Sequence, residues 1–148
     1  MRDFCTLDFQ GRTFAVAFEC LREVIEPPLI TPVPMAPAGV CGVANLRGDL
    51  LPVLALDPLL GMQTPQGVLA RRPWMAVFES GKNTLGILTS GVGTLREVAV
   101  ETFTGEQPPL NFIAGQLGVA DPKPPLVDLG VLLRQLTEKL HSATHSNS

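Results

Sequence analysis

The stretch from Cys41 to Leu56 reads C-G-V-A-N-L-R-G-D-L-L-P-V-L-A-L and organises the rest of the chain. Before Gly48-Asp49 the side chains alternate between two faces, as in a strand, and after it the residues are almost all apolar. This pattern predicts a β-hairpin that turns at Gly48-Asp49, because glycine tolerates the positive φ of a tight turn. Pro52 removes one ladder donor, so the returning strand is expected at a sheet edge or with a bulge at that point. Arg47 is then a cation on a strand flanked by apolar residues, and it needs a partner.

The partner of Arg47 is expected to be an acid, because an isolated charge on a largely buried strand costs several kcal/mol. Glu23, shortly before a proline-rich segment, is the preferred candidate, and Glu26 and Asp49 are the competitors. Asp49 is too close along the chain to meet a side chain that points out of the strand face. The pair would either fix how the first half of the chain folds or contact a partner protein directly.

Composition and charge narrow the class of protein. The 148 residues are 45% hydrophobic and 17% charged, with a net charge of −3, which favours a folded domain over a disordered chain. The clustered Lys and Arg of nucleic-acid-binding proteins are missing, and Arg71-Arg72 is interpreted as part of a solvated loop. No apolar run has the length of a membrane span, and residues 1–3 do not begin a signal peptide. We therefore expect a cytoplasmic protein that neither binds nucleic acid nor inserts into a membrane.

Candidate catalytic and metal-binding residues are few. The three cysteines form no C-x-x-C pair and are expected to be small core residues in a reducing compartment. His141 and His145 lie in or beside a polar tail, 142–148, that is expected to be disordered. Acidic residues are scattered rather than placed at metal-ligand spacing. We expect no enzymatic activity, no metal and no cofactor.

In the first half of the chain, alternation predicts a hairpin over residues 4–18 that turns at Gln10-Gly11. Residues 21–25 are expected to form a short helical turn. The five prolines of 27–37 keep that segment extended, so it can pair only at a sheet edge. Asp57 to Gly61 has the signals of a one-turn helix, with aspartate as the cap, proline at the first helical position and glycine at the end.

The second half begins after residues 62–72, a polar loop that we interpret as the junction of two subdomains. A hairpin is predicted over 74–89, and the further strands are expected at 95–100, 112–114 and 125–127. A helix with one leucine stripe follows from Asp128, its cap, to about His141. The whole domain is expected to span residues 3–141.

A weak internal repeat connects the two halves. Leu51 to Leu56 matches Pro124 to Leu129 at an offset of 73 residues, and the tetrapeptide L-R-E-V occurs at both 21–24 and 95–98. If the repeat is a true duplication, it predicts two similar β units of about five short strands each.

These motifs together resemble the signature of CheW-like chemotaxis adaptor domains, in which a G-V-x-N-L-R-G hairpin precedes a strand reading P-V-x-x-L. Residues 21–24 resemble the family's V-x-E-I, and 34–37 resemble its V-P-x-x-P link. Residues 74–88 resemble its second hairpin, and 126–129 resemble the closing L-L-D-L. The resemblance covers about residues 3–140.

The chain departs from the family pattern in its second unit. Where the family usually reads V-D-x-V, this chain has Thr89-Ser90-Gly91-Val92, and Thr94 stands where an acid is expected. In that register the second L-R-E-V falls two residues late. The departures concern contacts of the second unit more than the fold.

The resemblance implies a mainly β fold, with two five-stranded SH3-like β-barrel subdomains, a groove between them and a C-terminal helix. It implies a scaffold without activity of its own that couples the cytoplasmic tips of chemoreceptors to a CheA-type histidine kinase, in a flagellar, twitching or other pilus-type pathway. Such a protein is cytoplasmic and recruited to membrane-associated receptor arrays. Glu23 and Arg47 carry over as the family's salt bridge. The surface that binds receptor and kinase carries over to Leu21, Val24, Gly42, Val43 and Asn45.

Two other functions stay open at this point. A stand-alone small-molecule sensor would use the groove between the barrels as a pocket, and its thermal stability would rise with its ligand. An enzyme subunit or diverged paralogue that has lost contact with the kinase would account for the changed residues 89–91.

Overall fold

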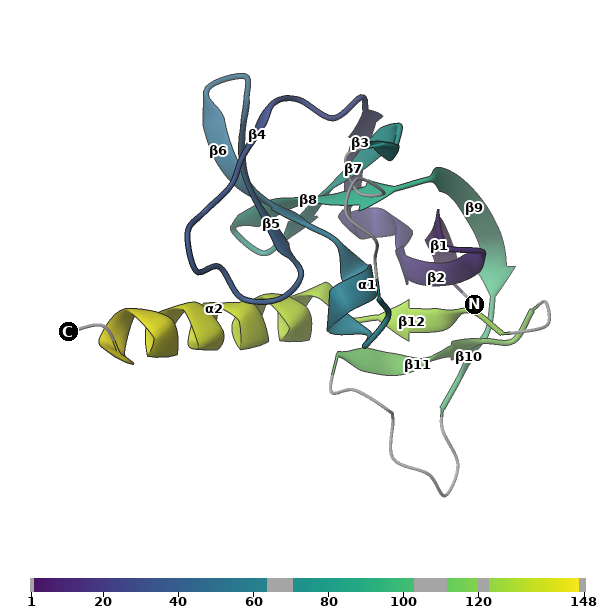
Figure 1. The fold of residues 1–148 in the computed structure, drawn as a ribbon. Helices are drawn as coiled ribbons and strands as arrows, with labels where there is room; N and C mark the ends of the chain where they lie inside the picture. Colours follow the sequence, from purple (N-terminus) through teal and green to yellow (C-terminus); the bar gives the residue numbers. More distant parts are fainter. Residues whose placement is uncertain (1, 64–70, 103–111, 120–122, 147–148) are drawn as a thin grey trace.

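The computed structural model of the protein describes residues 2–63, 71–102, 112–119 and 123–146, with side chains as far as residue 138 in the last helix (Figure 1). In chain order, its elements are β1 (Arg2–Phe9), β2 (Arg12–Ala17), the 3-10 helix η1 (Phe18–Cys20), β3 (Leu21–Ile25), β4 (Ile30–Thr31), β5 (Val40–Leu46), β6 (Asp49–Leu54), α1 (Leu56–Leu59), β7 (Trp74–Ser80), β8 (Asn83–Thr89), β9 (Gly91–Val98), β10 (Val100–Glu101), β11 (Ile113–Leu117), β12 (Pro125–Val127) and α2 (Leu129–Ser146). Among them, no helix combines the length and the apolar character that a membrane crossing requires.

Two hairpins form where alternating residues and turn residues predict them. β1 and β2 pair around Gln10-Gly11, whose φ angles are 51° and 72°. β7 and β8 pair around Gly81-Lys82. The strands predicted near residues 95, 112 and 125 are also present, although β9 already begins at Gly91.

The described residues form two six-stranded sheets, each built around one of these hairpins. The first sheet has the order β10-β11-β12-β2-β1-β9, and the second has the order β3-β7-β8-β6-β5-β4. The strand that follows each hairpin crosses to the other sheet, so that β3 pairs with β7 and β9 pairs with β1. The chain therefore connects the two sheets twice, once in each direction (Figure 1).

The sheets repeat one topology, and the repeat predicted at an offset of 73 is present in the register of the strands. β6 runs parallel to β8 with Val53 opposite Gly86, and β12 runs parallel to β2 with Leu126 opposite Ala15. Ala15 and Gly86 occupy corresponding positions, each four residues beyond its hairpin turn. The L-R-E-V match lies in corresponding strands, β3 and β9, but several residues out of register, so it is not part of the repeat.

The mainly β fold class is confirmed, with a difference in strand number. Each sheet has a sixth, two-residue strand at its edge, β4 or β10, beyond the five predicted. β4 lies within the proline-rich segment, which pairs at an edge as its prolines predict. Within the described residues, neither sheet closes its hydrogen bonding into a complete barrel.

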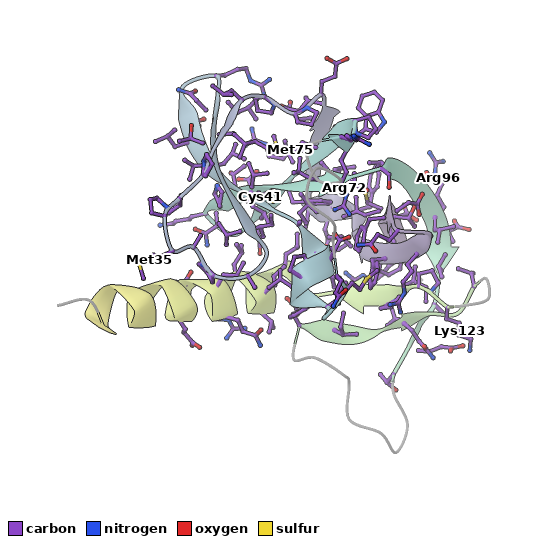
Figure 2. The ribbon with its side chains drawn as sticks, viewed as in Figure 1. Met35, Cys41, Arg72, Met75, Arg96 and Lys123 are labelled. Carbon is purple, nitrogen blue, oxygen red and sulfur yellow. The ribbon has the colours of Figure 1, made fainter. Side chains whose placement is uncertain are left out.

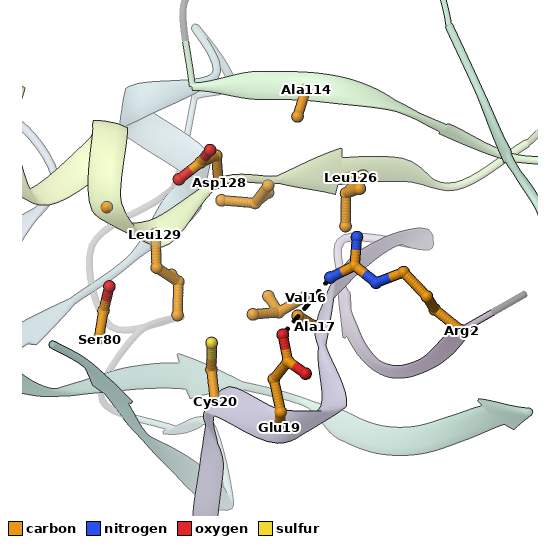
Figure 3. A pocket seen from close by; sticks show the side chains of 12 residues that line it. Arg2, Val16, Ala17, Glu19, Cys20, Ser80, Ala114, Leu126, Asp128 and Leu129 are labelled. Carbon is orange, nitrogen blue, oxygen red and sulfur yellow. Dashed lines mark ion pairs between the residues drawn. The ribbon is translucent and has the colours of Figure 1, made fainter.

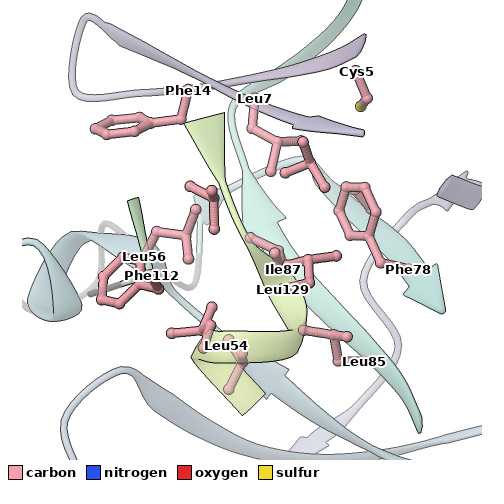
Figure 4. Packing of buried hydrophobic residues seen from close by; sticks show 14 of the residues in the cluster. Cys5, Leu7, Phe14, Leu54, Leu56, Phe78, Leu85, Ile87, Phe112 and Leu129 are labelled. Carbon is pink, nitrogen blue, oxygen red and sulfur yellow. The ribbon is translucent and has the colours of Figure 1, made fainter. Parts of the chain in front are cut away.

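Three clusters of buried apolar side chains hold the described part of the chain together. One lies inside the first sheet and includes Phe4 and Leu117, and another lies inside the second sheet and includes Met75. The largest lies between the sheets, where Leu7 and Phe14 face Phe78, Ile87 and residues of α1 and α2 (Figure 4). Both faces of β1 and β7 are covered, so alternate residues of each strand enter two different clusters.

Three local predictions need correction. Residues 21–25 form strand β3 rather than a helical turn, because the segment pairs with β7. Asp57 does not cap α1, since the N-cap residue is Ala55, which provides no side-chain hydrogen bond. Asp128 does cap α2, accepting a hydrogen bond from Val131 N at 3.2 Å, but the helix continues to Ser146, beyond its predicted end. Most of the predicted junction, residues 64–70, lies outside the described residues.

Candidate interaction surface

The β5–β6 hairpin turns one residue earlier than predicted. Leu46 pairs with Asp49, so Arg47 and Gly48 form a two-residue turn with φ angles of 51° and 92°. Asn45 Oδ1 accepts a hydrogen bond from Gly48 N at 2.8 Å and so stabilises this turn. Arg47 therefore lies at the hairpin tip rather than on a strand, in a backbone conformation that costs a side-chain-bearing residue about 1 kcal/mol or more.

Arg47 pairs with Glu23, the preferred partner, at 2.6 Å between Nη2 and Oε1. The expectation that the charges are buried is wrong, since the Arg47 side chain is 65% exposed and that of Glu23 is 30% exposed. An exposed pair of this kind contributes about 1 kcal/mol or less. In the second sheet, β7 and β8 lie between β3 and the β5–β6 hairpin. The ion pair joins β3 to the tip of that hairpin, so the sheet must curl until these two parts meet.

The five residues predicted to bind partners differ in their exposure. Val24 and Asn45 are exposed. Leu21 and Val43 are half-buried, and Leu21 packs against the central core. Gly42 is buried, and a Cβ on it would lie 2.2 Å from the carbonyl oxygen of Thr31, so glycine is required for β4 to approach β5. The structure thus exposes two of the five, packs Leu21 against the core, gives Gly42 a backbone role and leaves Val43 half-buried.

Exposed apolar side chains near this surface were not identified from the sequence. Trp74 on β7 is 40% exposed, and Leu50 on β6 is 75% exposed. Val24 lies opposite Ala76, two residues from Trp74, which places Val24 and Trp74 on the same face of the β3–β7 pair. Exposed apolar side chains that share a face, as Val24 and Trp74 do, are typical of surfaces that bind other proteins.

The buried ion pair among the described residues is a different one, between Asp57 and Arg72. Arg72 Nη1 lies 2.6 Å from Asp57 Oδ1 and Nη2 lies 2.5 Å from Oδ2, and the two side chains are 3% and 0% exposed. Arg72 was predicted to be in a solvated loop, which is wrong (Figure 2). The sequence does contain a signal for this buried pair, because Asp57 interrupts an apolar run and a buried carboxylate requires a cation.

This pair connects the two sheets. Gln10, in the β1–β2 turn, donates to Asp57 Oδ2 at 2.5 Å, and the guanidinium of Arg72 lies 5.4 Å from the ring centre of Phe9. Phe9 stacks on Phe14 with ring centres 4.8 Å apart. Burial by itself would raise the pKa of Asp57, but the hydrogen bonds from Arg72 and Gln10 and the charge of Arg72 outweigh it, so this pKa is lowered.

A groove of about 240 Å³ lies where the end of β2, the start of α2 and the end of β7 meet (Figure 3). Its charged groups are already engaged, because Arg2 pairs with Glu19 at 3.6 Å and Asp128 caps α2. Burial, with smaller effects of nearby Glu19 and Asp128, raises the pKa of Cys20, so its thiol stays protonated. The described residues contain no group of metal-ligating side chains.

The residues that depart from the family pattern attach β9 to β1. Thr89 is fully buried, and its Oγ1 lies 2.8 Å from the carbonyl oxygen of Asp8. Ser90 donates to the same oxygen from Oγ at 2.6 Å and from its backbone N at 2.9 Å. These substitutions therefore stabilise the corner between β8 and β9, and Thr94 pairs with Cys5 along β1.

Comparison with known proteins identifies relatives along most of the chain. The family model described as CheW-like domain matches residues 3–135. Protein PilI of Pseudomonas aeruginosa is 33% identical over 100 residues, 68% of this chain and 55% of PilI. The chemotaxis protein CheW of Rhizobium meliloti is 33% identical over 98 residues, 66% of this chain and 62% of that protein. The matched part of the chain therefore spans somewhat more than half the length of these relatives.

A solved structure shares the fold. The crystal structure of the scaffolding protein TtCheW from Thermoanaerobacter tengcongensis matches with a TM-score of 0.73, covering 85% of this chain and 88% of that one. The two sequences are 18% identical, so this likeness concerns the fold alone.

Proposed function

The chain belongs to the CheW-like domain family, and from this we propose that it is a non-enzymatic scaffold that couples chemoreceptors to a CheA-type histidine kinase, in a chemotaxis or pilus-type chemosensory pathway. The match over residues 3–135 is the observation that carries the proposal. The names of the relatives support the proposal, since two of them are chemotaxis proteins CheW and the others are PilI and the protein FrzA of Myxococcus xanthus.

The chemistry of the described residues is consistent with a protein that acts by presenting surfaces. The groups most changed by burial are an aspartate held in an ion pair and cysteines whose pKa values are raised. Neither arrangement provides a nucleophile or a general base at neutral pH. A scaffold needs instead a rigid body, which the core between the two sheets supplies.

We place the partner-binding surface on β3 and the β5–β6 hairpin. Val24 and Asn45 are the exposed members and would contact a partner directly. Leu21, Gly42 and Val43, which are less exposed, would help to position β3 and β5 without contacting the partner directly. The Glu23–Arg47 pair would hold β3 and the hairpin tip in fixed positions, and because it is exposed it is also within reach of a partner.

The proposed mechanism is simultaneous binding of receptor and kinase. A scaffold that binds both raises the local concentration of one near the other, and receptor state is then transmitted through packed interfaces. The protein would work in the cytoplasm and be recruited to receptor arrays at the membrane.

Sedimentation of receptor-containing membranes with the kinase tests the proposal. With the wild-type protein present, kinase in the pellet should exceed the amount without it. Val24→Glu should reduce this retention, whereas Leu29→Glu should not, since Leu29 is 88% exposed in the proline-rich segment, outside the proposed surface. No retention by the wild-type protein, or equal losses in both variants, would contradict the proposal.

A stand-alone sensor is the second candidate, and the groove of about 240 Å³ is the observation in its favour. A metabolite bound there should raise the melting temperature of the protein. It should also protect Cys20, which lines the groove, from alkylation. If no compound of a metabolite library shifts the melting temperature, the sensor is rejected.

A further inference from the structure

The β1–β2 turn begins with a residue that this kind of turn does not favour. Phe9 pairs with Arg12, so Gln10 and Gly11 are the two turn residues, with φ angles of 51° and 72°. A turn with positive φ at both positions favours asparagine, aspartate or glycine at the first of them, because other side chains crowd the backbone there. The corresponding hairpin of the second sheet has glycine, Gly81, at this position. Gln10 therefore has a strained backbone that the turn alone does not explain.

The side chain of Gln10 makes a contact that a smaller turn residue could not make. Its Nε2 donates a hydrogen bond of 2.5 Å to Oδ2 of Asp57, 47 residues further along the chain. Asp57 is fully buried, and both of its carboxylate oxygens also accept hydrogen bonds from Arg72. Hydrogen bonds to a charged group contribute more than those between neutral groups. The contact with Asp57 can therefore offset the strain of the turn.

This contact joins the first sheet to three elements of the second. Asp57 follows β6 in α1, and Arg72 precedes β7. Arg72 Nη1 also donates to the carbonyl oxygen of Leu88 on β8 at 3.3 Å. On the side of the first sheet, Phe9 lies beneath the same guanidinium, directly before Gln10. The end of β1 is thus held against the buried ion pair of the second sheet.

A hydrogen bond restricts orientation in a way that apolar contact does not. The core cluster between the sheets is apolar, and the hydrophobic effect is non-directional. A hydrogen bond to a carboxylate depends on both its distance and its angle. In some proteins, buried polar groups select one arrangement among several that apolar packing would allow.

We propose that Gln10 is a positioning residue, whose hydrogen bond to Asp57 holds the first sheet in one orientation relative to the second. Each sheet has its own strand pairing and its own apolar cluster, so loss of the contact should change their relative orientation without unfolding either sheet. Gln10 is itself exposed, so its replacement should leave no cavity in the core. The inference does not rest on the scaffold role, because its test contains neither receptor nor kinase.

Gln10→Asn tests the proposal because the turn and the contact predict changes of opposite sign. Asparagine suits the turn better, but its amide lies one carbon–carbon bond closer to the backbone and would no longer reach Asp57. If Gln10 served the turn alone, the melting temperature of Gln10→Asn would be higher than that of the wild-type protein. We expect it to be lower, by roughly 3 °C or more, because the contact is lost.

Arg47→Asn is the matched control. Arg47 also begins a two-residue turn with a positive φ, and its side chain also reaches another strand. Its ion pair with Glu23 is exposed and contributes little, so Arg47→Asn should have an unchanged or a higher melting temperature. A higher melting temperature of Gln10→Asn would overturn the proposal. So would an equal fall in both variants, because the loss could not then be assigned to the contact with Asp57.

Residual dipolar couplings of the backbone amides, measured by NMR, report the orientation itself. Gln10→Leu keeps a side chain of similar size and removes the donor. In the wild-type protein, one alignment tensor should fit the amides of both sheets. In Gln10→Leu, the tensor fitted to the first sheet should differ in orientation from the tensor fitted to the second. A single tensor that fits both sheets of Gln10→Leu as well as it fits the wild-type protein would overturn the proposal.

Discussion

Removing either partner of the Asp57–Arg72 pair should destabilise the protein strongly. Asp57→Ala leaves the guanidinium of Arg72, which is 3% exposed, without its carboxylate. Of the interactions of Arg72 given above, a hydrogen bond to the carbonyl oxygen of Leu88 at 3.3 Å and the cation–π contact with Phe9 would remain. Breaking a buried pair in this way costs about 3–5 kcal/mol. Because a whole domain is stable by roughly 5–15 kcal/mol, each single variant should lose a large part of its free energy of unfolding.

The assay is urea unfolding followed by far-UV circular dichroism and by fluorescence of Trp74, the only tryptophan in the chain. Asp57→Ala and Arg72→Ala are measured alone and together, so that a double-mutant cycle gives their coupling. The double variant should lose less than the sum, because no charge is then left unpaired. Replacement by apolar residues, Asp57→Leu with Arg72→Met, should recover most of the loss.

The exposed pair provides the control. Glu23→Ala and Arg47→Ala remove an ion pair of similar length, but the side chains are 30% and 65% exposed, so each should cost about 1 kcal/mol or less. Losses below about 1 kcal/mol for Asp57→Ala, or strictly additive losses in the cycle, would refute the argument that this buried pair holds the two sheets together.

Three further predictions follow from burial and backbone geometry. The pKa of Asp57 is lowered, so the folded protein binds a proton on this carboxylate less tightly than the unfolded chain does. The stability that Asp57 contributes is therefore present above its unfolded pKa and is lost as acid titrates the folded state. From about pH 5 to about pH 3 the unfolding free energy should fall less steeply in Asp57→Asn than in the wild-type protein, and equal slopes would contradict this prediction. Gly42→Ala should lower the unfolding free energy, measured in urea, by about 2 kcal/mol or more, because it adds a clash with Thr31 to a φ of 152°. Gly48→Ala has open space around the added methyl group and should cost about 1 kcal/mol. The reverse order would show that the close approach of β4 is unimportant. Burial raises the pKa of Cys5 to about 11, so a thiol reagent at neutral pH should label the two partly exposed cysteines first, and early labelling of Cys5 would show that β1 opens locally.

The two central hairpins, the edge position of the proline-rich segment and the cap of α2 could be predicted from the sequence because each depends on local signals. Gln10-Gly11 is a turn whatever surrounds it, and Asp128 caps a helix whose leucine stripe is visible. The repeat at an offset of 73 could be predicted as well, since it reflects the shared register of β6 and β12.

Predictions that depended on tertiary contacts were less accurate. Residues 21–25 have both helix-forming and strand-forming residues, and their pairing with β7, at least 50 residues further along the chain, decides in favour of a strand. The sequence identified correctly that a cation needs a carboxylate, and it identified Glu23 as the partner of Arg47. It did not show that this pair is exposed and that the buried pair is Asp57–Arg72, because burial depends on how the two sheets pack.

The candidate surface was predicted in part for the same reason. The glycine at 42 and the asparagine at 45 were identified from the hairpin motif, and the structure gives both a local role in shaping β5 and its turn. Exposed Trp74 and Leu50 were not identified, since nothing in an apolar strand indicates which side chain the neighbouring strands leave uncovered.

Kinase retention by receptor-containing membranes, measured with Arg47→Ala under conditions where that variant is fully folded, tests the proposed scaffold most directly. The Arg47 side chain is exposed at the hairpin tip, so its removal should leave the fold intact and reduce retention about tenfold. Retention equal to that of the wild-type protein would contradict the claim that this hairpin is the surface through which the protein joins its partners.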